Sequence, residues 1–439
     1  MITEQDKQLA RQMMDFARQK GCSACRISLG TGTENEFEYR NTQLEKLQQS
    51  SQNYMRATLF VDGRYGAYST NRIELNELKK FIGNAIDSTR YLAEDPHRQL
   101  PPLERCYKGK ESFDECYDSQ FDTVRPDDKL NAAKAAAAEV YGSDPRIVSV
   151  TANYFDSDWF SYMIDSNGFE GQQSQTSYSL SAEVSIKGDG DARPESWWYD
   201  SALFWQQLKK EGIGRKALER VMKKLGQKKI KSGKYPMLVD NMNSSRLLSP
   251  LISAMNGEAL AQKNSFLADM LGKKIASDKL TLADEPHLPK AQGARRFDGE
   301  GVATQRRAVI EGGVLQTYFI DTYNANRLNM PPTVSGASVL TLKTGNKDLD
   351  GLAATLSKGI LVTGFNGGNS NSNTGDFSFG VEGFLVERGK LVKPVSEMNV
   401  TGNLLALWAN LQEVGNDVRL NSSWRMPSLL FDDVSFSGL

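Results

Sequence analysis

Histidine and cysteine, the side chains that most often bind zinc or act as bases and nucleophiles, are scarce in this sequence. Its two histidines, His97 and His287, each follow a proline and lie far apart along the chain. No H-E-x-x-H or related helical pair is present, and a catalytic zinc needs three protein ligands on rigid elements. The sequence therefore argues against a zinc site built from its own histidines.

Motifs for nucleophilic and phosphate chemistry are missing as well. A Ser-His-Asp triad would need one of the two histidines, yet there is no G-x-S-x-G turn. There is no G-x-x-x-x-G-K-[ST] loop to hold phosphates. Hydrolysis by a pair of carboxylates stays open, because Asp and Glu are abundant and their pairing in space cannot be read from sequence.

One C-x-x-C pair occurs, formed by Cys22 and Cys25. A zinc ribbon would need a second such pair, whereas nine residues separate Cys106 from Cys116. A thioredoxin-like site would place the pair at the start of a helix, but here it follows a predicted helix and enters a predicted strand. We interpret the two cysteines as small buried residues at a turn, and a redox role stays open.

Length and charge restrict the class of protein. A chain of 439 residues predicts two or three domains. The 53 Lys and Arg nearly balance the 54 Asp and Glu, so no overall field attracts nucleic acid or an anionic membrane. The N-terminal stretch has no signal-peptide pattern, and no run of about 18 apolar residues occurs. We expect a cytoplasmic protein that binds neither nucleic acid nor membrane.

The first half, residues 1–230, is predicted to be an α+β domain with an antiparallel sheet. Thr3 can cap a helix that ends near Gly21, and alternation from Cys25 onward, with a turn at Asp62-Gly63, indicates a meander. A second turn is expected at Asn167-Gly168. The remaining predicted elements are helices at 73–92, 127–141 and 204–225, a loop at 96–124, and strands at 147–154, 161–166 and 174–188.

The second half, residues 231–439, is predicted to be a β-rich domain with few helices. It is rich in Gly and Asn and has many short strand-like runs. One helical region is expected near 247–271, and the segment 364–373 is predicted to be a mobile surface loop.

Three segments of this half carry a resemblance to a known family. They are 243–275, which contains SFLADMLGK, 297–329, which contains FDGEGVATQRR, and 374–417, which runs from TGDFSFGVEGF to LQEVGND. They resemble the TldD/PmbA family, also known as modulators of DNA gyrase, and specifically its PmbA/TldE-type subunit. The resemblance is strongest from about 240 to the end and looser over the first 230 residues.

The resemblance implies a metallopeptidase complex of two homologous subunits. The TldD-type subunit of this family carries zinc on a helical H-E-x-x-x-H motif and a C-terminal cysteine. At the corresponding positions this chain has Ser249, Pro250 and Ala254, and near the C-terminus it reads SSWRMPS over 422–428. The resemblance thus implies that this chain has no catalytic residue, metal or cofactor of its own, and that the partner subunit supplies the zinc.

Several residues of the matched segments are candidate contacts for a peptide or for the partner. A Gly-rich edge offers backbone groups to an extended peptide, although a purely structural hairpin would need the same residues. Two adjacent arginines in a strand point to opposite faces, and either one is also suited to a structural ion pair. The candidates are Thr374, Gly375, Asp376, Ser378, Gly380, Arg306, Arg307 and Glu300.

Two classes of function are compatible with these observations. The first is a scaffolding subunit that pairs with a TldD-type homologue, or with a second copy of itself, and helps to admit unfolded peptides for proteolysis. The second is an autonomous peptidase or hydrolase with chemistry that does not use zinc. Direct binding to gyrase or DNA draws no support from the balanced charge.

Overall fold

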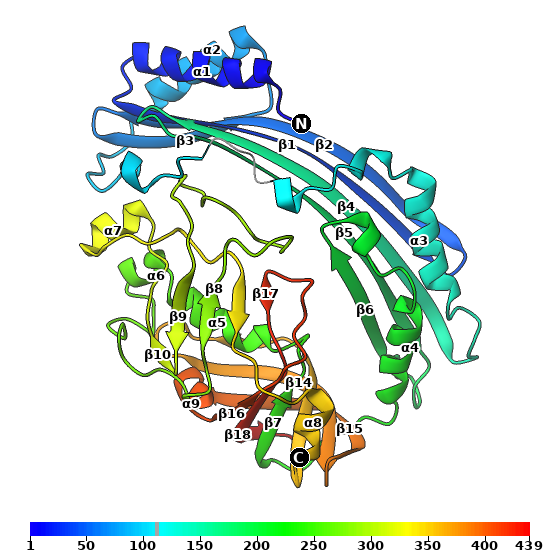
Figure 1. Ribbon diagram of the computed structural model, residues 1–439. Helices are drawn as coiled ribbons and strands as arrows, with labels where there is room; N and C mark the ends of the chain where they lie inside the picture. The colour runs from blue at the N-terminus through cyan, green and yellow to red at the C-terminus, as the bar shows by residue number, and fades with distance from the viewer. Residues whose placement is uncertain (110–113) are drawn as a thin grey trace.

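A curved antiparallel sheet forms most of the first half of the chain. The structure, a computed structural model, describes residues 1–109 and 114–439. The six strands run antiparallel in the order β3-β2-β1-β4-β5-β6 (Figure 1). They are β1 (Ala24–Arg40), β2 (Gln43–Val61), β3 (Arg64–Thr70), β4 (Ile147–Asp165), β5 (Glu170–Ile186) and β6 (Glu195–Ala202). The predicted α+β class with an antiparallel sheet is confirmed.

Within residues 1–109 and 114–230, four α-helices and four short 3-10 helices accompany this sheet. In Figure 1, α1 and α2 lie at one end of the sheet, and α3 and α4 lie at the other. The helices are α1 (Glu4–Gln19), α2 (Leu75–Thr89), α3 (Pro126–Ala138), α4 (Ile213–Lys223), η1 (Leu103–Arg105), η2 (Asp114–Cys116), η3 (Phe121–Thr123) and η4 (Trp205–Gln207). No helix of the described residues is long and apolar enough to cross a membrane.

Local signals in the sequence explain the first elements. The Thr3 hydroxyl accepts a hydrogen bond from the Asp6 N–H at 3.2 Å and closes a capping box at the start of α1. The turn between β2 and β3 has φ of 50° at Asp62 and 73° at Gly63, as a tight hairpin requires. Gly168, with φ of 103°, lies in the turn between β4 and β5. The predicted first helix and both predicted turns are confirmed.

Alternation along the strands gives the sheet two different faces. Cys25, Ile27 and Leu29 of β1 are buried under α1 and α2, and Phe37, with the same parity, is buried with α3 and α4. All four helices therefore cover one face. The opposite face is polar and includes Ser28, which lines a cavity shared with the second half.

The second half contains two smaller sheets. One has the order β12-β7-β18-β15-β14-β13 with β16 beside β18, and the other has the order β10-β9-β8-β11-β17. The strands are β7 (Gly233–Val239), β8 (Leu282–Asp284), β9 (Arg307–Glu311), β10 (Val314–Leu315), β11 (Leu340–Leu342), β12 (Lys358–Phe365), β13 (Asn369–Ser370), β14 (Asp376–Glu387), β15 (Lys390–Asn403), β16 (Leu411–Val414), β17 (Trp424–Arg425) and β18 (Leu429–Ser437).

Short helices complete the second half, and all of them except α8 share one core with both sheets. Leu251 of α5, Val309 of β9 and Phe431 of β18 belong to this single buried cluster. The helices are α5 (Ser245–Ala254), α6 (Gly257–Ala261), α7 (Thr322–Leu328), α8 (Leu349–Ala354) and α9 (Leu404–Ala409). The predicted β-rich character is confirmed, whereas the boundary near residue 230 stays a prediction.

Several predicted elements differ from the structure. The helix predicted at 204–225 begins only at Ile213, because Gly212 has a left-handed φ of 79° and the preceding segment turns through η4. Strand β6 was not predicted, although Trp197 and Trp198 lie within it. Strand β4 is continuous where two shorter runs were expected, because its polar middle section keeps pairing with β1 and β5.

A buried ion pair joins the two halves. The Arg26 guanidinium donates to both carboxylate oxygens of Asp165 at 2.6 and 2.7 Å. It also donates to the carbonyl oxygens of Gly299 and Glu300 in the second half at 3.1 and 2.6 Å. The Asp165 side chain is fully buried and that of Arg26 is 12% exposed. Four acceptors therefore fix one cation at the junction.

We predict that Arg26→Met lowers the free energy of unfolding by about 3–5 kcal/mol, because it leaves the Asp165 carboxylate buried without its partner. Urea denaturation followed by intrinsic fluorescence measures this change. The control is Lys234→Gln, which breaks a largely exposed pair with Asp433 and should change the same quantity by about 1 kcal/mol or less. Equal effects of the two substitutions would contradict the assigned role of Arg26.

Candidate functional site

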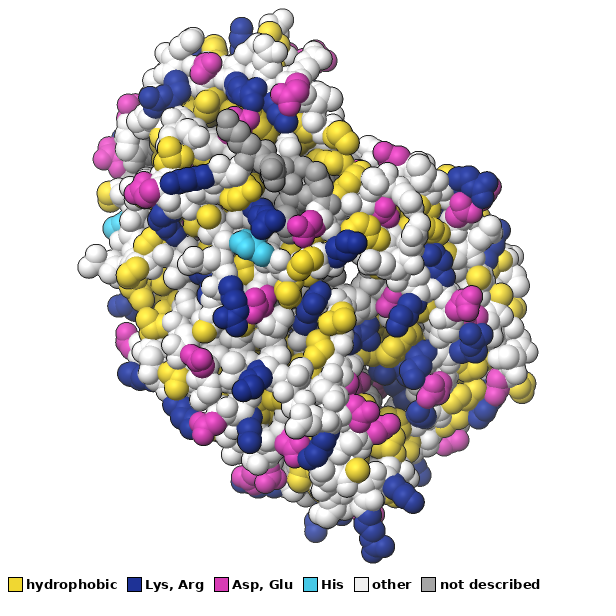
Figure 2. Space-filling view, viewed as in Figure 1, with side chains coloured by type: hydrophobic (Ala, Val, Ile, Leu, Met, Phe, Trp, Pro, Cys, Tyr) yellow, Lys and Arg dark blue, Asp and Glu magenta, His cyan; other side chains and the backbone are white. Residues whose placement is uncertain are grey.

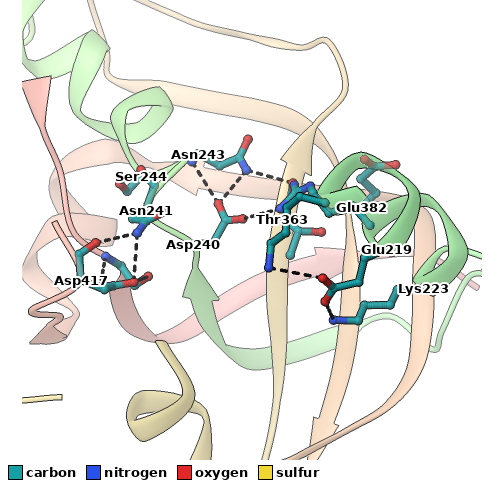
Figure 3. Close-up of polar contacts among 12 residues, drawn as sticks. Glu219, Lys223, Asp240, Asn241, Asn243, Ser244, Thr363, Glu382 and Asp417 are labelled. Carbon is teal, nitrogen blue, oxygen red and sulfur yellow. Dashed lines mark hydrogen bonds and ion pairs between the residues drawn. The ribbon is translucent and has the colours of Figure 1, made fainter. Parts of the chain in front are cut away.

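Helix α5, which contains the family's motif positions, is held by a polar cap at one end and by a buried apolar stripe. The Asp240 carboxylate accepts hydrogen bonds from the Asn243 N–H at 3.0 Å and from its side-chain amide at 2.7 Å, as Figure 3 shows. Leu247, Leu248 and Leu251 are fully buried in the core of the second half. The helix is thus positioned by contacts that require no metal.

Pro250 lies inside this helix, which starts five residues earlier, at Ser245. A proline there removes one backbone hydrogen bond. Burial of the apolar stripe on the same helix offsets that loss. The helical region predicted to reach residue 271 is also shorter, since α5 ends at Ala254 and the separate helix α6, capped by Asn256, ends at Ala261.

The motif positions line a surface cleft of about 450 Å³. Ser249, Pro250 and Ala254 form one wall, and Asn369 lies in the segment that contributes the opposite one. Among the described residues that line the cleft, only Arg246 is charged. Its guanidinium lies 4.8 Å from the Phe379 ring centroid and donates to the Gly368 carbonyl oxygen at 3.0 Å. The cleft therefore offers hydroxyls, amides and one cation.

These donors do not fit a zinc ion, which takes imidazole, thiolate or carboxylate ligands. Pro250 and Ala254 have no side-chain donor atom, and Ser249 has only a hydroxyl. In residues 1–109 and 114–439, no group of three or more His, Cys, Asp and Glu side chains has an arrangement that could hold a metal ion. The chemistry available in the cleft is hydrogen bonding.

The predicted Gly-rich contact segment lies beside this cleft. The Asp376 carboxylate accepts hydrogen bonds from the Thr374 hydroxyl at 2.7 Å and the Asn403 amide at 3.0 Å, and these bonds lower the pKa of Asp376. Gly375 has a left-handed φ of 78°, and a Cβ there would meet the Phe266 ring at 3.2 Å. Phe266 also lines the cleft. The structure therefore brings the motif helix and this turn together.

Ser378 and Gly380 lie on β14, directly after that turn. Ser378 pairs with Asn369 of the two-residue strand β13, so part of the segment predicted as a mobile loop is a strand at the sheet edge. A Cβ at Gly380 would lie 2.3 Å from the Asn366 carbonyl oxygen. Glycine is required there because the returning chain passes so close.

The other predicted contact residues lie elsewhere. Arg306 forms an exposed ion pair with Glu285 at 2.8 Å. Arg307 lies 3.8 Å from the buried Asp284, and burial lowers its pKa. Glu300 is partly buried, and at the start of α7 its carboxylate accepts hydrogen bonds from the N–H and hydroxyl of Thr322 at 2.8 and 3.0 Å. The structure does not bring these three residues to the α5 cleft.

Contacts between α4 and the second half were not predicted. Lys224 forms an ion pair with Glu382 of β14 at 2.7 Å. Arg220 approaches Asp240 at 3.9 Å and donates to the Thr363 carbonyl oxygen at 3.4 Å. Figure 3 labels Asp240, Thr363 and Glu382, which are the second-half members of these contacts. The residues of these contacts are far apart in sequence. The only feature of the sequence that could have indicated them is the set of Lys and Arg residues in the helix predicted at 204–225.

The cysteines are buried thiols. Burial raises the pKa of Cys22 to about 11 and that of Cys25 to about 12. None of the four cysteines forms a disulfide within the described residues. A thiol with so high a pKa is a poor nucleophile at neutral pH.

The arched sheet and the β-rich second half define a two-part α+β architecture, and comparisons with known proteins identify the family. The model of the PmbA/TldA metallopeptidase central domain matches residues 119–225, and that of the C-terminal domain matches residues 232–438. The chain belongs to the PmbA/TldD family.

Three relatives support this assignment. A Bacteroides thetaiotaomicron protein, named as a candidate modulator of DNA gyrase, has a crystal structure that is 58% identical, with a TM-score of 0.98 and complete coverage of both chains. Metalloprotease PmbA of Escherichia coli O157:H7 is 27% identical over 94% of this chain and 91% of its own. TldE from Thermococcus kodakarensis, 20% identical over 98% of this chain and all of its own, shares the fold with a TM-score of 0.86.

We predict opposite pH responses for two aspartates at this site. Burial raises the pKa of Asp240, although Asn243 and Arg220 oppose the shift. Its protonated form is therefore favoured in the folded state, and wild type should gain stability relative to Asp240→Asn as pH falls from 7 toward about 4. The pKa of Asp376 is lowered, so wild type should lose stability relative to Asp376→Asn as pH falls through about 4.

Thermal unfolding midpoints of the three proteins, measured between pH 3 and 7, provide the test. Parallel pH curves for wild type and Asp240→Asn would show that the carboxylate of Asp240 titrates normally.

Proposed function

We propose that this chain is the PmbA/TldE-type subunit of a cytoplasmic zinc metallopeptidase complex that degrades unfolded peptides. In this proposal a homologous TldD-type subunit supplies the zinc, and the present chain acts as partner and scaffold. Two homologous subunits can dock through a pseudo-two-fold interface and enclose one active site between them.

One observation carries the proposal. The cleft at the motif helix is present, but Ser249, Pro250 and Ala254 stand where zinc ligands and a general base would be needed. The relative from Escherichia coli is named a metalloprotease, and the family's C-terminal segments are well matched here. A cleft that keeps its shape but lacks side chains able to bind zinc favours a role in subunit pairing over a role in catalysis.

The first test is metal content. We expect the purified chain to hold no stoichiometric zinc, because its cleft offers hydroxyl and amide groups and a guanidinium. Elemental analysis after dialysis measures this. About one tightly bound zinc per chain would overturn the proposal.

The second test is activity. We expect no cleavage of an unfolded peptide by this chain alone, and cleavage that a chelator abolishes when the TldD-type partner is added. Ser249→Ala and Ser253→Ala in this chain should leave that activity within about twofold, because neither hydroxyl acts as a nucleophile in this proposal. Cleavage by this chain alone that resists the chelator would instead support an autonomous hydrolase. Full activity of the partner alone would exclude the scaffold role.

A further inference from the structure

A second cavity lies between the edge of the large sheet and the C-terminal half. It measures about 650 Å³, and its lining comes from β6, from the segment that leads into α4, and from residues 290–292 and 418–425. Figure 2 shows the surface hollowed between the two halves, with Lys and Arg side chains gathered along the hollow. Four cations line it, namely Lys209, Lys290, Arg419 and Arg425, against the two carboxylates Asp200 and Glu211.

Arg425 is the most constrained of these cations. Its Nε is buried, and among residues 1–109 and 114–439 it has no hydrogen-bond partner. No ion pair of its guanidinium occurs within those residues. Burial also lowers the pKa of Arg425, and no carboxylate opposes that shift. A partly buried cation without an anion costs free energy, so this site is suited to an anion from outside the chain.

Two of the other cations, Arg419 and Lys290, lie against aromatic rings. The Arg419 guanidinium lies 5.2 Å from the Trp198 ring centroid and 4.7 Å from that of Tyr199. The Lys290 ammonium lies 5.3 Å from the Phe204 ring centroid. Aromatic faces orient a cation and leave its N–H groups available to a ligand. Lysines that are only solvated at a surface need no aromatic ring to orient them.

The carboxylate of Asp200, which lines the cavity, does not serve as the missing anion. Asp200 accepts hydrogen bonds from the Lys209 N–H at 2.9 Å and from the Asn421 amide at 3.2 Å, one with each oxygen. Both of its oxygens are therefore occupied by groups other than the arginines. The cavity keeps an excess of two positive charges, from four cations and two carboxylates.

We propose that this cavity binds the carboxylate of an acidic peptide, with Arg425 as the central contact. Strand β6 pairs only with β5 among the described strands, so its outer edge offers backbone groups to an extended chain. Trp197 on this strand is 50% exposed and adds apolar surface. A free phosphate would present the same oxyanion chemistry. The choice of a peptide rests on the proposed function, whereas anion binding does not.

The test measures binding to the isolated chain by calorimetry at low salt. The probes are a capped pentapeptide with two glutamates, the same peptide with two glutamines, and inorganic phosphate. We expect the glutamate peptide to bind, the glutamine peptide to bind at least about tenfold more weakly, and Arg425→Met to lose at least about tenfold in affinity for the glutamate peptide. Arg215→Met, an exposed α4 residue paired with Glu139, is the matched control and should bind like wild type.

Each other outcome overturns the proposal. Equal affinity for the two peptides, or unchanged affinity in Arg425→Met, would contradict a contact between Arg425 and a peptide carboxylate. If phosphate binds and the glutamate peptide does not, the ligand is not a peptide. Thermal unfolding checks that Arg425→Met is folded, and Arg425→Lys, which keeps the charge, should retain part of the affinity. Because no partner subunit is present, failure here is distinct from failure of the activity test above.

Discussion

The buried pair of Arg26 and Asp165 is the interaction on which the arrangement of the two halves depends. The pair alone would not compensate for removing two charges from water, so its value lies in the additional hydrogen bonds to the carbonyl oxygens of Gly299 and Glu300. Those carbonyls belong to the second half, while Arg26 and Asp165 belong to strands of the first. The cavity that Arg26 lines, about 650 Å³ in volume, is bounded by residues of both halves, so this contact lies where the cavity forms.

The two faces of the large sheet explain why this cavity is polar. Helices bury one face, so the strands alternate apolar residues on that side with Ser, Thr and Gln on the other. Ser28, Ser161 and Gln175 line the cavity, and the exposed rings of Tyr54 and Trp159 lie among them. Such a surface makes hydrogen bonds and ring contacts without demanding a particular sequence. Such a surface is compatible with the varied peptides of the proposed function.

Local signals made much of the fold predictable, and long-range contacts account for what was missed. The Thr3 cap and the Asp62-Gly63 turn follow from neighbours in sequence. Strand β6 was missed because it is set by pairing with β5, and α4 starts late because Gly212 interrupts the helical pattern. At the candidate site, the motif positions came from the resemblance to the family. Their approach to the Gly-rich turn followed only from the fold, as did the unpaired Nε of Arg425.

Helix α5 keeps its position through packing and hydrogen bonds alone. Zinc ligands often stabilise the elements that carry them, so losing the ligands from such a site would loosen its helix. Here Asp240 caps the segment before α5, and three fully buried leucines fix its inner face. The helix therefore needs no metal to keep its position. It can contain Pro250, which removes one backbone hydrogen bond. The shape of the cleft therefore comes from the core beneath the helix and does not depend on a metal.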